Sequence, residues 1–355
     1  MMIRYVTACY LLLLFALQTH GFAPQTHGGI VEIAVEEPTG VARQSWPVTS
    51  GIPLAAGQLQ EQKAAALFAE DGRELPLQTE ALARWPDGSV RWLLLDFQVD
   101  LQAKQKRTLM LRYGKEIRRT SVADPLDVDQ TDDGVVIRTG PMRLAIARGG
   151  CPLPGQVSLD LDRDGRFAPE EQITDPDSPG VVLIDEEGRE FSTAAGPVEI
   201  SVEQSGPMRA CVRLAGQHVA GDGHKFRYIA RIHAYRGRSA LRIYYTFIND
   251  CQQPLMSRFK SLDFVMRRKT ADGPTLLGGK VASSGTLLQV DENQYVIDGK
   301  PAGRRALGWV ASGGKRAGMA LGLREFWQNW PKGLEVGPDQ IKIGICPAFP
   351  KGLYD

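Results

Sequence analysis

The stretch that decides the fold is Leu82–Val99, which reads LARWPDGSVRWLLLDFQV. Its centre is an Asp-Gly dipeptide at Asp87-Gly88, with runs of apolar and aromatic residues on both sides. Asp-Gly accepts the positive φ of a tight hairpin turn at little cost, so the stretch predicts two antiparallel strands joined by a short turn. The same dipeptide occurs seven times along the chain, which predicts many hairpins.

Runs rich in β-branched and aromatic residues flank most of these turns. Val135–Arg138, Arg227–Tyr235 and Leu241–Ile248 are the clearest strands. No segment of about a dozen residues keeps a helical period of apolar residues. The sequence therefore predicts an all-β protein, built from hairpins that form sandwiches or barrels.

An acidic stretch divides the chain. Ser121–Asp133 (SVADPLDVDQTDD) contains a proline and lacks aromatic residues, which is typical of a linker. We expect a small domain over residues 28–120 and a larger one over residues 134–355. The larger domain has enough strand candidates for a two-sheet antiparallel sandwich.

The first 23 residues are typical of a secretory signal peptide. Arg4 supplies the positive charge, and Val6–Leu17 is an apolar run too short to span a bilayer. Cleavage is expected near Gly21 or Ala23. We therefore expect a secreted or periplasmic protein with no membrane span after cleavage. A buried N-terminal helix or an uncleaved anchor is the alternative.

Charge and cysteine content narrow the possible partners. The chain carries 42 basic and 41 acidic residues, a net charge of +1, which argues against a nucleic-acid or polybasic membrane partner. Four cysteines lie beyond the signal segment and none has CxxC spacing, so zinc binding has no support and at most one disulfide is expected. Cys211 lies in an apolar run and is predicted to be buried.

One short motif predicts a calcium loop between strands. Residues 160–171 match the pattern D-x-[DN]-x-[DN]-G-x5-E. The proposed ligands are Asp160, Asp162, Asp164, the backbone carbonyl of Arg166, and Glu171. We expect a structural Ca²⁺ here. The alternative is a solvated acidic turn.

Two pairs of motifs resemble a known family. Trp46–Leu54 (WPVTSGIPL) and Leu82–Leu93 resemble the N-terminal RIFT-barrel domain of the exo-rhamnogalacturonan lyase and YetA-like family. Arg231–Gly237 (RIHAYRG) and Phe326–Pro331 (FWQNWP) resemble the central β-sandwich of that family. The resemblance covers nearly all of the chain after the signal segment.

The resemblance implies a RIFT-type barrel followed by a β-sandwich, and degradation of a pectin-type polysaccharide by β-elimination. Members of the family continue into a helical toroid domain, whereas this sequence ends at Asp355. We therefore expect catalysis to need a helical domain supplied separately, and leave open whether the chain is an enzyme. The alternatives are a non-catalytic module that binds a polysaccharide or oligosaccharide, or an inactive truncated fragment.

The predicted strand Arg227–Tyr235 carries the candidate chemistry. Uronate β-elimination needs a base, positive groups that neutralise the carboxylate, and an acid. Period-two alternation places Arg227, Arg231, His233 and Tyr235 on one face. Arg231, His233 and Tyr235 are the catalytic candidates, and Arg227 and Arg231 are candidates for binding substrate. A solvated outer face with ordinary cross-strand pairs is the alternative.

Aromatic residues give a second candidate for sugar contact. Trp327 and Trp330 are predicted to stack on sugar rings, with core or interdomain packing as the alternative. Trp46, Trp85 and Trp92 are expected in the core of the first domain. The flanking arginines, Arg84 and Arg91, are expected to cover their rings.

Overall fold

The computed structural model describes residues 28–251, 256–267, 269, 273–282, 284–314 and 316–349. The predicted signal peptide, residues 1–23, lies outside these ranges. The described chain is built of strands with a single short 3₁₀ turn, η1 (Pro169–Glu171), so the all-β prediction is confirmed. None of its helical segments has the length and apolar character needed to cross a membrane. Two units form: one comprises residues up to Leu126 together with Gly206–Arg209, and the other holds the remaining residues.

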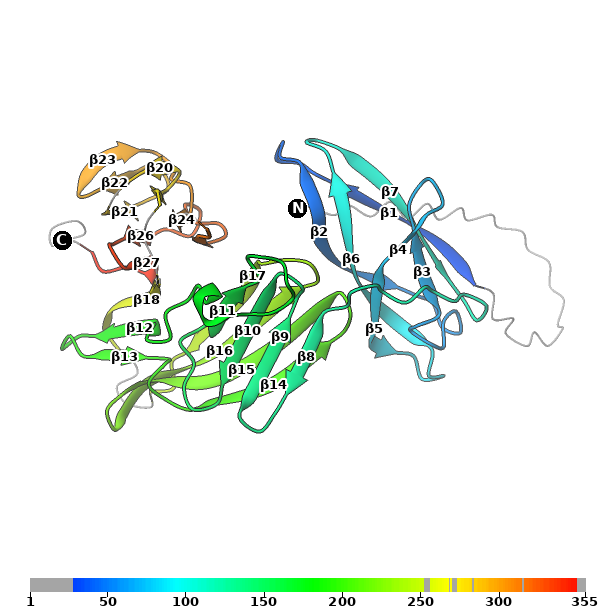
Figure 1. The fold of residues 1–355 in the computed structure, drawn as a ribbon, viewed down its shortest axis with the longest axis horizontal. Helices are drawn as coiled ribbons and strands as arrows, with labels where there is room; N and C mark the ends of the chain where they lie inside the picture. Colours follow the sequence, from blue (N-terminus) through cyan, green and yellow to red (C-terminus); the bar gives the residue numbers. More distant parts are fainter. Residues whose placement is uncertain are drawn as a thin grey trace. The chain divides into compact units, whose positions relative to one another are not determined.

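The first unit contains two antiparallel sheets (Figure 1). Their strands are β1 (Gly29–Glu36), β2 (Arg43–Pro53), β3 (Ala65–Phe68), β4 (Glu74–Leu75), β5 (Leu77–Arg84), β6 (Val90–Leu101) and β7 (Lys106–Tyr113). The sheet orders are β1-β7-β3-β4 and β2-β6-β5. The β5–β6 hairpin turns at Asp87-Gly88, as the opening stretch of sequence predicts, and Gly88 has a φ of 83°. Aliphatic side chains fill the core, with Leu67, Leu95 and Leu111 fully buried.

The three tryptophans of this unit lie outside the core, so their predicted position is wrong. Trp92 is 42% exposed, and Trp46 and Trp85 are partly exposed. The indole of Trp92 lies against Gly51 on the neighbouring strand, where an added Cβ would be 2.1 Å from the indole nitrogen. Leucine and valine at alternate positions of β6 already fill the inward face, which leaves Trp92 on the outer face.

Cations cover two of these indoles. The guanidinium of Arg91 lies 4.7 Å from the ring centroid of Trp85, as predicted for this hairpin. The guanidinium of Arg43 lies 4.4 Å from the centroid of Trp46. Arginine stems and ring faces thus shield apolar surface from water at the edge of the unit.

A buried ion pair joins distant parts of the sequence within the first unit. The Nε of Arg209 donates to Asp96 over 2.7 Å, and the two side chains are only 6% and 5% exposed. Thr49 also donates its hydroxyl to Asp96, over 2.5 Å. The amide oxygen of Gln78 accepts from the backbone N–H groups of Met208 and Arg209. These bonds satisfy polar groups that would otherwise be costly to bury.

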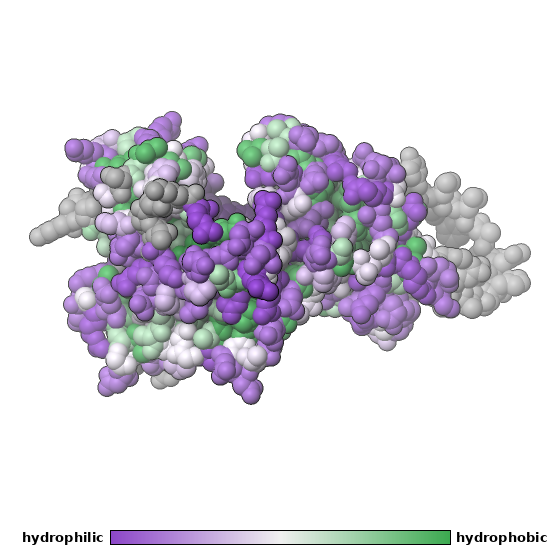
Figure 2. Space-filling model, viewed as in Figure 1, coloured by the Kyte–Doolittle hydropathy of each residue, from purple (hydrophilic) through white to green (hydrophobic). Residues whose placement is uncertain are grey.

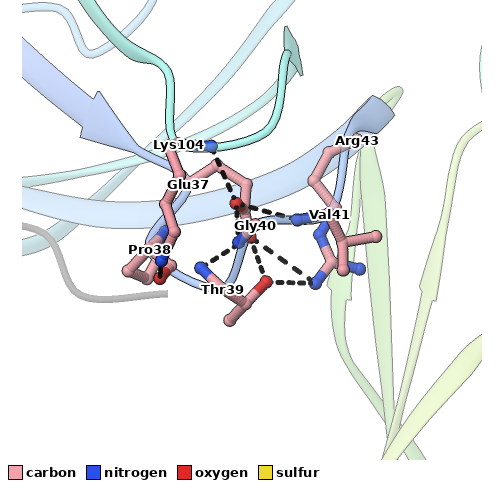
Figure 3. Close-up of polar contacts among 7 residues, drawn as sticks. All are labelled: Glu37, Pro38, Thr39, Gly40, Val41, Arg43 and Lys104. Carbon is pink, nitrogen blue, oxygen red and sulfur yellow. Dashed lines mark hydrogen bonds and ion pairs between the residues drawn. The ribbon is translucent and has the colours of Figure 1, made fainter.

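A second buried carboxylate organises the turn between β1 and β2 (Figure 3). Glu37 is 2% exposed. Its oxygens accept bonds from the Thr39 hydroxyl and from four backbone amides, those of Thr39, Gly40, Val41 and Lys104. Burial alone would raise the pKa of Glu37, but these hydrogen bonds outweigh it and lower that pKa from 4.5 to about 2.

The second unit contains a sandwich and an attached smaller sheet. Its strands are β8 (Asp127–Gln130), β9 (Gly134–Arg138), β10 (Met142–Ala147), β11 (Gln156–Leu159), β12 (Gly180–Asp185), β13 (Glu190–Ser192), β14 (Val198–Ser205), β15 (Arg209–Ala220), β16 (Gly223–Tyr235), β17 (Leu241–Ile248), β18 (Phe259–Arg267), β19 (Thr275–Leu277), β20 (Lys280–Val281), β21 (Gly285–Gln289), β22 (Tyr295–Ile297), β23 (Lys300–Gly303), β24 (Trp309–Ser312), β25 (Met319–Gly322), β26 (Lys332–Val336) and β27 (Gln340–Cys346).

Three sheets arise from these strands. One has the order β11-β10-β9-β8 and another β20-β19-β24-β25. The largest has twelve strands in the order β17-β16-β15-β13-β12-β18-β27-β26-β21-β22-β23, with β14 paired to β15. The acidic stretch expected to be a linker is therefore partly a strand, because Asp127–Gln130 pairs with β9.

The sheet β11-β10-β9-β8 and the β15–β17 part of the large sheet form the two layers of the sandwich (Figure 1). The Thr139 hydroxyl donates to the carbonyl of Arg238 over 2.7 Å and so ties the two layers at one end. Leu144 from one layer and Ile232 from the other are fully buried. Most of the visible surface of both units is hydrophilic, as Figure 2 shows.

Four cysteines lie in this unit. Within the described residues, the sulfurs of Cys151, Cys211, Cys251 and Cys346 form no disulfide. Cys151 and Cys211 are buried, which confirms the prediction for Cys211.

Candidate functional site on strand β16

Strand β16 alternates between the sandwich core and an outer face, as its sequence predicts. Phe226, Tyr228, Ala230, Ile232 and Ala234 are buried at 1% exposure or less. The residues between them are partly or fully exposed and share the outer face: Arg227, Ile229, Arg231, His233 and Tyr235. The structure thus places the predicted catalytic and binding candidates of this strand on one surface.

Arg231 is already paired with a carboxylate. Its Nε and Nη2 donate to the two oxygens of Glu203 on β14, over 2.7 and 2.9 Å. The hydrogen bond from Arg231 lowers the pKa of Glu203, and the same bond raises the pKa of the guanidinium. Such fork geometry is the strongest arrangement available to an arginine and a carboxylate. A uronate could use Arg231 only by competing with Glu203.

Arg227 is paired as well. Its Nε lies 3.2 Å from a carboxylate oxygen of Asp250, and its side chain is 56% exposed. Exposed pairs of this kind are weak, about 0–1 kcal/mol, so Arg227 is more available to a ligand than Arg231.

His233 lies beside a thiol. Its Nε2 is 3.7 Å from the Sγ of Cys211 on β15, and that sulfur is 3.6 Å from Glu203. The imidazole also meets the ring of Tyr244 on β17 edge-on, with centroids 5.3 Å apart. Glu203, Cys211 and Tyr244 were not predicted as members of this face. The alternation of side chains along a strand tells which face of its own strand each residue occupies. The order of the strands in the sheet, which the sequence does not give, brings these residues beside His233 and Arg231.

The aromatic candidates form a separate group after β25. Phe326 is 3% exposed and anchors the segment against Gly308, where an added Cβ would be 2.2 Å from Phe326. The guanidinium of Arg305 covers Trp327 at 4.0 Å from a ring centroid. Trp330 is 41% exposed. Of the two predicted stacking residues, Trp330 therefore offers the more open ring.

The acidic loop after β11 brings three of its predicted ligands together. Carboxylate oxygens of Asp160, Asp162 and Asp164 lie within 4.8 Å of one another. Asp160 accepts the backbone N–H groups of Asp164 and Gly165, each over 3.1 Å. Gly165 has a φ of 80°, the conformation that the sharp turn of such a loop requires.

The other two predicted ligands take part in local bonds. The N–H of Arg166 donates to Asp164 over 2.8 Å. Glu171 is 3% exposed, and its oxygens accept from the N–H groups of Leu161 and Ala168 over 2.7 and 3.0 Å. These backbone bonds, with that of Leu161 foremost, lower the pKa of Glu171. Glu171 is therefore ionised and held at the base of the loop, where it is also the last residue of the turn η1.

A small barrel followed by a large antiparallel sandwich defines a class of all-β proteins with two β domains in sequence. The family described as "PcRGLX-like N-terminal RIFT barrel domain" matches residues 37–111. That described as "PcRGLX-like protein central beta sandwich domain" matches residues 126–261 and 290–342, more than half of the chain. The chain belongs to the PcRGLX-like family. The resemblance that its motifs indicate is thereby confirmed.

The chain is also similar to longer proteins. It is 22% identical over 374 residues to the uncharacterised protein YetA of Bacillus subtilis (strain 168), and the match covers 86% of this chain and 41% of YetA. The chain thus spans less than half the length of this relative.

Two crystal structures from Enterococcus faecalis share the fold at 10% identity. One is a protein in glycosyl hydrolase family 38, with a TM-score of 0.52 over 89% of this chain and 40% of that chain. The other is an alpha-mannosidase of strain V583, with a TM-score of 0.53 over 90% of this chain and 40% of that chain. At this identity the likeness shows the arrangement of strands alone. Family and relatives together support a carbohydrate-active protein.

Proposed function

We propose that this chain provides the saccharide-binding β domains of an exported protein that degrades a pectin-type polysaccharide by β-elimination. The observation that carries the proposal is the match of both domains, in order, to the PcRGLX-like family. The open indole of Trp330 adds a surface that suits a sugar ring, because flat aromatic faces bury the apolar side of a pyranose.

In this proposal, the chain contributes contacts, and a helical domain contributes the rest of the catalytic cleft. β-Elimination from a uronate needs cations that are free to neutralise its carboxylate. Arg231 is engaged by Glu203, and Arg227 by Asp250. Recruiting Arg231 for catalysis would break its ion pair, so the β16 face alone is a poor elimination site.

The proposal is tested with the purified chain and rhamnogalacturonan. Unsaturated uronate products are measured by their ultraviolet absorbance, and binding is measured by pull-down on the insoluble polymer. Binding without product supports a saccharide-binding role that needs a further domain. Product formation by the chain alone would contradict the proposal that catalysis needs a helical domain. Absence of both binding and product would overturn the proposed function.

We also propose that the loop Asp160–Glu171 holds a structural Ca²⁺. Hard oxygen ligands on alternate residues suit this cation. The support is the convergence of three carboxylates within 4.8 Å, together with a nearby ionised Glu171. The ion would balance the mutual repulsion of the three aspartates and tie the loop after β11 to the turn η1.

A further inference from the structure

A groove of about 630 Å³ lies in the first unit, and none of the candidate site residues described above lines it. Two loops line it, the one that leads into β3 and the one that follows β7: Gly57, Gln58, Leu59, Gln60, Glu61, Lys63, Ala64, Lys115, Ile117 and Arg118. The loops meet because β3 and β7 are neighbours, with Ala65 paired to Tyr113 (Figure 1). Its volume is within the roughly 300–1,000 Å³ of small-molecule sites.

The first loop is held in place by bonds to the rest of the unit. The side-chain oxygen of Gln58 accepts from the hydroxyl of Tyr113 over 3.1 Å. The carbonyl of Gln60 accepts from Arg84 over 3.0 Å. A loop fixed in this way loses little conformational entropy when a ligand binds.

The floor and the rim of the groove differ in chemistry. Leu59 and Ala64 on the floor are 2% and 9% exposed, and Ile117 is partly buried beside them. On the rim, three cations face one carboxylate, that of Glu61. Arg118 donates to the carbonyls of Lys115 and Ile117 over 2.7 and 3.0 Å, which fixes the second loop.

The two lysines of the rim differ from Arg118 in their contacts. Among the described residues, the ammonium groups of Lys63 and Lys115 form no hydrogen bond or ion pair, whereas Arg84 and Arg118 are engaged. One unpaired ammonium comes from each loop. An apolar floor between two unpaired ammonium groups is suited to a ligand with an apolar face and a negative charge.

We infer that this groove binds an acidic saccharide, with Lys63 and Lys115 contacting its carboxylate groups and the floor contacting an apolar ring face. The saccharide class rests on the proposed function, and the need for a carboxylate rests on the charges of the groove. The contact would place part of a uronate-containing chain on the barrel domain, on residues other than strand β16 and Trp330.

The test measures binding of a short oligogalacturonide to the whole chain by calorimetry at low ionic strength. Lys63→Gln and Lys115→Gln each remove one ammonium and keep a side chain of similar length. Lys106→Gln is the matched control, because Lys106 is an exposed lysine of the same unit that does not line the groove. The fully methyl-esterified oligogalacturonide lacks the negative charges, so it tests whether binding depends on the carboxylate groups.

We expect each groove variant to weaken binding about tenfold, the lower range for a charge-assisted hydrogen bond. Lys106→Gln should bind the acid form as tightly as the unaltered chain does. The unaltered chain should bind the ester as weakly as the double variant, Lys63→Gln with Lys115→Gln, binds the acid form. Equal binding by the groove variants, equal binding of the ester, or no binding of the acid form would each overturn the inference. In these cases, continued binding of rhamnogalacturonan in the pull-down would leave the proposed function standing, and its loss would overturn both.

Discussion

Removing one partner of the buried pair between Asp96 and Arg209 should strongly destabilise the first unit. Arg209→Met keeps most of the side-chain volume but leaves the Asp96 carboxylate, 5% exposed, without its cation. Breaking a buried pair on one side costs about 3–5 kcal/mol. That is a large share of a typical stability of about 5–15 kcal/mol. Asp96→Asn should also be costly, because it removes the carboxylate that neutralises the buried guanidinium of Arg209.

Urea unfolding followed by tryptophan fluorescence measures these losses. The double variant should lose less than the sum of the single losses by about 2–3 kcal/mol, since it leaves no isolated charge. Arg73→Met is the control, because Arg73 lies 3.9 Å from Asp71 in an exposed pair whose side chains are 61% and 64% exposed. Its expected cost is below about 1 kcal/mol. If Arg209→Met costs no more than the control, or if the losses at Asp96 and Arg209 are additive, the reasoning is refuted.

Three further outcomes are expected. Glu37→Gln should lower the urea midpoint most near neutral pH, because the pKa of Glu37 is about 2 in the folded chain and 4.5 ordinarily. The difference in midpoint between this variant and the unaltered chain should therefore shrink as the pH falls from about 4.5 to 2. A difference in midpoint that does not change with pH would contradict this. Calcium should raise the melting temperature of the unaltered chain and leave that of Asp162→Ala unchanged, whereas a melting curve unaffected by chelator would contradict the calcium loop. Gly51→Val should shift the fluorescence emission of the chain by displacing Trp92, at a cost of about 1–3 kcal/mol, and an unchanged spectrum would count against this contact.

The sequence predicted local features of the fold well. The hairpin at Asp87-Gly88 and the alternation of strand Arg227–Tyr235 depend on neighbouring residues, and both are present. The acidic stretch Ser121–Asp133 is only partly the linker that its composition predicts. Residues Asp127–Gln130 form a strand because their backbone pairs with β9, and composition does not reveal that pairing. Trp92 shows a second limit: whether an aromatic residue is buried depends on which face of the strand reaches the core.

In the candidate sites, too, the sequence predicts what depends on neighbouring residues and does not predict what depends on the pairing of distant strands. Asp160, Asp162 and Asp164 converge as expected, because alternate residues of one turn are close in any case. Arg231 and Glu203 are 28 residues apart in sequence and lie on different strands. They meet only because of the order in which the strands pair in the sheet. Lys63 and Lys115 meet at one groove only because β3 lies beside β7. Nothing in the composition of either loop indicates this.

The ion pair between Asp96 and Arg209 has a consequence for biosynthesis. Its partners are 113 residues apart in sequence. At a synthesis rate of roughly 5–20 residues per second, Arg209 is made on the order of 10 s after Asp96. For most of that interval the strands of the barrel, the last of which ends at Tyr113, have been made, but the buried carboxylate of Asp96 has no cation. The barrel therefore reaches full stability only after a late segment has left the ribosome, and a fragment ending at Leu126 would keep this defect permanently.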